Sequence, residues 1–241
     1  SEEAFSRMEE AGLKPEDCVV WYGPNLGESF WEYLAAVILR SKGYFVTDYN
    51  LGAGDVSAYY IPDYYDALRR RGLISTGVFL EELEMLPQPR QPGPEKLEDE
   101  VKLVLIEAES TDRRTGSRGN NAGVGQVLYF LQRAPCYYTH AFVAGPYCKP
   151  EDIYEDYIGL ISCDEDGNLT YKEGERYRET REEAVQLVKT VIKSRLLRNL
   201  TFQEKCELIG SKPANPKEYY EKLLALNIDI ILDHIEHKVK T

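Results

Sequence analysis

The fold of this chain is decided by Val101–Ser110, the stretch VKLVLIEAES. Its apolar run is typical of a strand buried inside a sheet, yet it ends on two acids, Glu107 and Glu109. Side chains alternate between the two faces of a strand, so both glutamates point the same way, about 6 to 7 Å apart along the strand. Burying both acids unpaired would cost several kcal/mol each, whereas a divalent cation takes carboxylate oxygens as ligands. The alternative is that the strand ends at Glu107 and that water solvates both acids.

Length and composition predict a soluble globular domain. The chain has 241 residues, of which 43% are hydrophobic and 29% are charged. No apolar window approaches the roughly 20 residues that cross a bilayer, and the acidic N-terminus does not resemble a secretion signal. We therefore expect a cytoplasmic protein without a membrane span. The net charge of -12 argues against broad, nonspecific adhesion to nucleic acid, but it allows a local basic groove.

Basic side chains gather in three places along the chain. The clusters are Arg69–Arg71, then Arg113 with Arg114 and Arg118, then Lys189 with Lys193, Arg195 and Arg198. Taken singly, such clusters are expected to lie on a solvated surface. The second cluster follows Glu107 and Glu109 directly, which makes it the candidate for phosphate contact.

The rest of the sequence alternates between helical and strand patterns. We expect helices at 28–42, 62–72, 77–86, 124–133, 180–200 and 215–240. We expect strands at 44–49, 55–61, 101–110 and 137–145, and a hairpin over 157–172. This order predicts an α/β fold with a mixed central sheet flanked by helices. The expected division is an α/β core at 1–175, with a helical insert at about 62–96, and a C-terminal helical extension at 176–241 packed on the same domain.

Other polar residues are placed to join the two glutamates. Glu28 falls on the apolar face of the first expected helix, and Asp55 opens a strand after a glycine-rich turn. One pocket could therefore collect carboxylates from three elements. Gln126 and Tyr129 lie three residues apart on the helix that follows the arginine-bearing loop, so they share a face.

These pieces resemble the PD-(D/E)XK nuclease superfamily, the restriction endonuclease-like fold. The resemblance covers roughly 27–171 and follows the core order α-β-β-β-α-β. It rests on four stretches: GESFWEYLAAVILRSKGYFV, GDVSAYYIP, LVLIEAES and GQVLYFL.

The resemblance implies a role for each matching position. Asp55 and Glu107 would bind Mg²⁺ or Mn²⁺ with the backbone carbonyl of Ala108, and Glu28 would hold a metal-bound water. In a nuclease of this kind, we expect Arg113, Arg114 and Arg118 to contact the phosphate backbone of DNA. Gln126 and Tyr129 would help to orient the substrate or the active-site loop. The literal Pro62-Asp63 pair offers another candidate for the aspartate. We prefer Asp55, because its context is strand-like whereas Asp63 stands where an acid caps a helix.

Glu109 is the main departure from the family pattern, which has a lysine at this position. Some restriction enzymes of the superfamily carry an acid there, used as a general base or as a ligand to a second metal. The resemblance therefore implies a Mg²⁺-dependent DNA endonuclease, with a homodimer if both strands are cut. The alternative is a catalytically inactive module that binds nucleic acid or a protein partner. A hydrolase of small phosphate esters is disfavoured, because the sequence has no glycine-rich phosphate loop.

Overall fold

A six-stranded mixed sheet forms the centre of the protein. The computed structural model describes residues 28–47, 54–71, 100–109, 122–133, 137–145, 153–163, 169–198 and 200–240. The strands are β1 (Phe45–Thr47), β2 (Val56–Tyr60), β3 (Lys102–Ala108), β4 (His140–Ala144), β5 (Ile158–Cys163) and β6 (Leu169–Lys172), and they are ordered β1-β2-β3-β4-β5-β6 across the sheet. The first three strands pair antiparallel, β3, β4 and β5 are parallel, and β6 returns antiparallel to β5. The predicted α/β class and its mixed sheet are confirmed.

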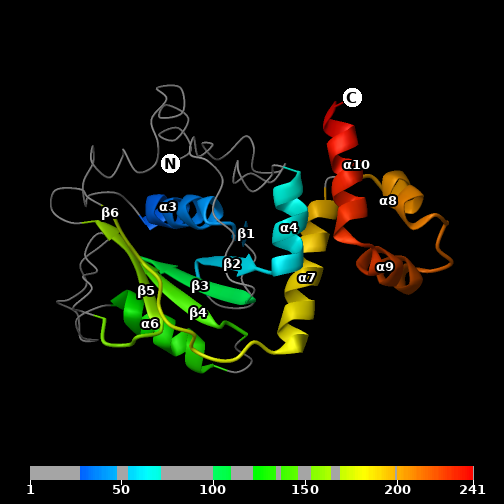
Figure 1. Ribbon diagram of the computed structural model, residues 1–241. Coiled ribbons are helices and arrows are strands. Elements are labelled where there is room, and N and C mark those ends of the chain that lie inside the picture. Colours follow the sequence, from blue (N-terminus) through cyan, green and yellow to red (C-terminus); the bar gives the residue numbers. More distant parts are fainter. Residues whose placement is uncertain are drawn as a thin grey trace.

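Two helices cover opposite faces of this sheet (Figure 1). They are α3 (Glu28–Ser41) and α6 (Ala122–Gln132), and α6 connects the parallel strands β3 and β4. Apolar residues of β3 alternate between the two layers: Val104 and Ile106 join the core under α3, and Leu105 joins the core under α6. The continuous apolar run of β3 at residues 103–106 therefore reflects burial on both faces of the sheet.

The turn from α3 into β1 follows the sequence prediction closely. Gly43 has a φ of 96°, the left-handed conformation that a glycine adopts most easily just beyond a helix. A side chain at this position would also collide with the ring of Tyr65, because a Cβ on Gly43 would lie 2.5 Å from the nearest ring carbon. The short connection folds α3 back across the sheet, so the N-terminus of α3 lies at the end where β1 and β3 finish.

The C-terminal part differs from the prediction in two ways. The helix expected at 215–240 is two helices, α9 (Pro216–Ala225) and α10 (Ile228–Lys240), separated at Leu226 and Asn227. A further helix, α8 (Phe202–Ile209), was not predicted. Its start carries a capping box, in which Thr201 and Glu204 each accept a hydrogen bond from the other's backbone N–H.

The C-terminal helices pack on the same core as the sheet. Three helices lie beside one another past the end of the sheet: α4 (Pro62–Arg70), α7 (Glu182–Leu197) and α10 (Figure 1). Val188 of α7 and Ile231 of α10 belong to the same buried cluster as Leu68 of α4 and the α3 face of the sheet. The helix predicted at 77–86 and the proline-rich connection that follows it lie outside the described residues.

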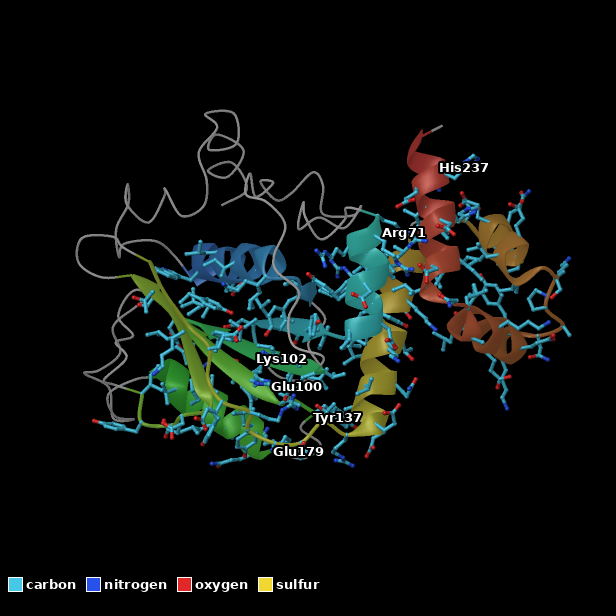
Figure 2. All side chains as sticks on the ribbon, viewed as in Figure 1. Arg71, Glu100, Lys102, Tyr137, Glu179 and His237 are labelled. Atoms are coloured by element: carbon cyan, nitrogen blue, oxygen red, sulfur yellow. The ribbon has the colours of Figure 1, made fainter. Side chains whose placement is uncertain are left out.

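Ion pairs fasten α10 to the end of α4. Arg71 Nη1 lies 2.7 Å from the Asp229 carboxylate, its Nη2 pairs with Asp233, and its Nε lies 3.6 Å from Glu236 (Figure 2). Arg70 reaches Asp229 at 3.2 Å, but 66% of its side chain is exposed, compared with 12% for Arg71.

Across the described residues, no helix is long and apolar enough to cross a membrane.

Candidate functional site

Asp55 lies alongside Glu107, where β2 begins and β3 ends. The backbone N–H of Asp55 donates to the carbonyl of Ile106 at 3.0 Å, and its Oδ2 accepts from the backbone N–H of Ala108 at 2.8 Å. Asp55 is thus bonded to the residue on either side of Glu107. The preceding Gly54 has a φ of 83°, and a Cβ at this position would lie 2.0 Å from Leu105 Cδ1. This close approach brings the Asp55 backbone against β3.

The two glutamates of β3 are buried. Glu107 is 2% exposed and Glu109 is 8% exposed, so the alternative in which water solvates both acids is wrong. Glu107 pairs in register with Val143 of β4, which belongs to the core under α6. Because side chains alternate along β3, Glu107 and Glu109 face α6 rather than α3. In such surroundings the effective dielectric constant is low, and charge interactions are stronger than in water.

Gln126 contributes an unsatisfied polar atom on the α6 side of the sheet. Its side-chain oxygen, Oε1, is buried and has no hydrogen-bond partner among the residues that the structure describes. A buried acceptor of this kind normally has a donor, which a water or a bound substrate can supply. Tyr129 is in different surroundings: it is 48% exposed, and the guanidinium of Arg133 lies 4.0 Å from the centre of its ring.

Two groups of predicted site residues fall partly or wholly beyond the described side chains. Helix α3 begins at Glu28, which places the backbone of Glu28 at the end of the sheet where β3 finishes, but its side chain is not described. Arg113, Arg114 and Arg118 lie outside the described residues. Asp63 is far along the fold from Glu107: it follows the end of β2, where Tyr60 pairs with Lys102 at the start of β3, and its side chain is 84% exposed.

The first and third basic clusters are largely engaged within the protein. Arg71 contacts the acids of α10, and Lys193 Nζ donates to the carbonyl of Leu224 at 2.6 Å. Lys189 lies 4.0 Å from Asp63, and Arg195 is 6% exposed. The solvated-surface interpretation is therefore wrong for Arg71, Lys193 and Arg195, whereas Lys189 pairs with an exposed carboxylate at the surface. Arg69 and Arg198 are exposed, as that interpretation predicts.

The carboxylate oxygens of Asp55 and Glu107 are suitable ligands for a hard cation, although the described side chains do not supply a complete set of ligands. Within the described ranges, no group of three or more His, Cys, Asp or Glu side chains is arranged to hold a metal ion. Mg²⁺ usually takes one or two protein carboxylates and completes its shell with waters and substrate phosphates. Asp55 and Glu107 supply oxygens of the required type from adjacent strands.

Comparison with known proteins adds no assignment. No family model matches the chain, and no curated protein or solved structure matches it significantly.

Proposed function

We propose that this protein is a metal-dependent deoxyribonuclease that hydrolyses phosphodiester bonds with an activated water. The observation that carries the proposal is the position of Asp55, hydrogen-bonded through Oδ2 to the residue between the buried Glu107 and Glu109. Apart from α4, which falls in the expected helical insert between β2 and β3, the succession α3, β1, β2, β3, α6, β4 also follows the core order that the resemblance to PD-(D/E)XK nucleases implies.

The chain's own residues would bind and orient the reacting groups. Asp55 and Glu107 would hold Mg²⁺ or Mn²⁺, with the backbone carbonyl of Ala108 as a further ligand. The bound ion would supply positive charge for the phosphate and lower the pKa of an attacking water. Because the Ala108 N–H is already bonded to Asp55, this short segment of backbone is fixed before substrate binds. Such preorganisation lowers the reorganisation needed at the moment of reaction.

Glu109 is assigned the place of the family lysine. A carboxylate there would act as the general base for the attacking water or as a ligand to a second ion. Gln126 lies on α6, which begins at Ala122. Its buried Oε1, which has no partner within the described ranges, can accept a hydrogen bond from water or substrate. Glu28 would act from the start of α3.

DNA is the proposed partner. Arg113, Arg114 and Arg118 would contact its phosphates, because the other basic clusters are largely paired within the protein. Cleavage of both strands of a duplex would require a second active site, which a homodimer would supply.

A panel of DNA substrates tests the proposal. Plasmid, linear duplex, single-stranded and branched DNA are incubated with the wild type and with Glu107→Gln, each with Mg²⁺, with Mn²⁺ and with EDTA. We expect cleavage by the wild type that requires metal and is lost in Glu107→Gln, whose side chain keeps the shape but not the charge. Equal cleavage by the two proteins, or none by the wild type on any substrate, would overturn the proposal.

Glu109 favours a second candidate function, because it replaces the lysine on which most members of the superfamily depend. The protein would then be an inactive module that binds nucleic acid or a protein partner. Thermal unfolding during titration with Mg²⁺ or Mn²⁺ separates the two functions. Stabilisation that disappears in Glu107→Gln supports the nuclease, and no stabilisation of the wild type supports the module.

A further inference from the structure

The backbone of Glu109 is held by the end of the neighbouring strand. The parallel pairing of β3 and β4 ends at Ala108 and Ala144, and the N–H of Glu109 then donates to the carbonyl of Ala144 at 2.8 Å. The residue after Ala144 is Gly145, which is buried. Glu109 is therefore fixed from the β4 side, as Asp55 is fixed from the β3 side.

Gly145 lies so close to Glu109 that no side chain fits between them. A Cβ on Gly145 would lie 2.3 Å from the carbonyl oxygen of Glu109, 3.3 Å from its carbonyl carbon and 3.7 Å from its Cβ. The first distance is below any real contact of a Cβ atom, and the first two atoms are backbone, which cannot rotate away. The glycine is required here for space, since its φ is not positive.

Gly145 is itself held in place by β5. Its N–H donates to the carbonyl of Ile161 at 2.9 Å, and its carbonyl accepts from the hydroxyl of Ser162 at 2.5 Å. Ser162 is 2% exposed, so this hydrogen bond lies inside the protein. A larger residue at position 145 would therefore press directly on the backbone of Glu109, because two hydrogen bonds to β5 hold Gly145 on its other side.

We infer that Gly145 is a positioning residue for the Glu109 carboxylate, and that Ser162 supports it. The inference rests on the proposed nuclease function, in which Glu109 acts on the attacking water or on a second ion. A glutamate side chain is shorter than the lysine it replaces, so its reach depends more strongly on where its backbone lies. The close approach of Gly145 sets that position, and a displacement of about 1 Å at a reacting group lowers a rate by about 100-fold.

A double-mutant cycle tests whether Gly145 acts through Glu109. The rate of metal-dependent DNA cleavage is measured for the wild type, Gly145→Ala, Glu109→Gln and the double variant. We expect Gly145→Ala to lower kcat by about 100-fold with little change in KM, and to cause no further loss in the Glu109→Gln background. Ser162→Ala, which removes only the supporting hydroxyl, should lower kcat in the same direction by a smaller factor.

Gly159→Ala is the matched control for crowding within the sheet. A Cβ at Gly159 would lie 2.7 Å from the carbonyl oxygen of Lys172 on β6 and 2.7 Å from the ring of Phe142 on β4. Gly159→Ala should change kcat by the same factor in the wild-type background and in the Glu109→Gln background. Thermal unfolding of every variant shows which of them remain folded. If Gly145→Ala does not fold, the same cycle is measured with Ser162→Ala in place of Gly145→Ala.

The outcomes separate the inference from the proposed function. A wild type that cleaves no substrate refutes the nuclease, and the inference with it. An active wild type whose Gly145→Ala variant is equally active, or loses the same factor with and without Glu109, refutes only the positioning role.

Discussion

The backbone N–H of Ala108 donates a 2.8 Å hydrogen bond to the carboxylate of Asp55. This bond joins the start of β2 to the end of β3 through Oδ2, one of the two carboxylate oxygens of Asp55. The same carboxylate therefore has a structural role and, in the proposed function, a metal-binding role, and substitutions can separate the two.

Asp55→Asn should keep the hydrogen bond to Ala108 and lose the ability to bind the metal ion. An amide oxygen still accepts from Ala108, so we expect the free energy of unfolding to stay within about 0.5 kcal/mol of wild type, whereas Asp55→Ala should lose about 1 kcal/mol or more. Both variants should lose Mg²⁺-dependent cleavage and Mg²⁺-dependent thermal stabilisation. Urea denaturation and a metal titration measure the two effects. Wild-type cleavage by Asp55→Asn would contradict the proposed metal role.

The salt dependence of DNA binding tests the assignment of the basic clusters. Replacing Arg113, Arg114 and Arg118 together by alanine should reduce the slope of log affinity against log salt by about 0.9 for each DNA phosphate that the arginines neutralise. Lys193→Ala should leave that slope unchanged, because Lys193 donates to Leu224 within the protein. Fluorescence anisotropy in EDTA measures binding without cleavage. An unchanged slope in the triple variant would place the DNA contact elsewhere.

Gly54→Ala should destabilise the protein more than Gly210→Ala. Both glycines have positive φ, 83° and 71°, so both substitutions carry the cost of a left-handed alanine, about 1 kcal/mol. Only Gly54 has a close neighbour, since its Cβ would lie 2.0 Å from Leu105 Cδ1, whereas nothing lies within 4 Å of Gly210. We expect Gly54→Ala to cost about 1 to 3 kcal/mol more in the free energy of unfolding. Equal losses in urea denaturation would show that the contact relaxes freely.

Arg71→Met should weaken the attachment of α10 to α4, with Arg70→Met as its matched control. Arg71 is mostly buried and contacts three acids, so its loss leaves Asp229, Asp233 and Glu236 facing one another. We expect the free energy of unfolding to fall by about 2 to 3 kcal/mol, against less than about 1 kcal/mol for the exposed Arg70. Urea denaturation and hydrogen exchange in α10 measure both. The same loss in both variants would mean that the contacts of Arg71 are worth no more than a surface pair.

His140 should make stability depend on pH below neutrality. Burial, with Lys102 and Arg176 nearby, lowers the pKa of His140 to about 4 from its ordinary 6.5, although Glu100 and Glu173 oppose the shift. Between these two values the unfolded chain binds a proton that the folded protein does not, so the contribution of His140 to stability is complete above pH 6.5 and is lost as pH falls toward 4. Thr139 Oγ1 lies 2.8 Å from Nδ1 of the ring, within hydrogen-bond distance.

The measurement compares urea denaturation at pH 7 and pH 5. The wild type should lose about 1 kcal/mol more than His140→Gln over this interval, after allowance for solvent screening. His237→Gln, on the exposed part of α10, should behave like the wild type. An NMR titration that gives His140 a pKa near 6.5 would contradict the prediction directly.

Local patterns predicted most of the central sheet. Gly43 marks the end of α3, and the apolar run of Val101–Ser110 marks β3, because both signals depend on residues close in the sequence. The helix α8 was missed although Thr201 and Glu204 carry a capping-box pattern that the sequence displays. The break at Leu226 and Asn227 was missed because both sides of it continue a helical apolar pattern.

Pairing between distant residues could not be read from the sequence. The two glutamates were predicted to share a face, but their burial depends on strands and helices that pack around them. Arg71 meets Asp229, which lies 158 residues away, so the partner of a basic cluster is decided by the fold and not by its neighbours. The position of Asp55 beside Ala108 depends likewise on a strand pairing across 53 residues.

The shared core also limits how this chain can be divided. Val188 and Ile231 pack in the same cluster as Leu68 and the α3 face of the sheet, so a protein ending near residue 175 would expose the apolar side of α4 to water. The helical extension therefore shares one hydrophobic core with the sheet that carries the carboxylates.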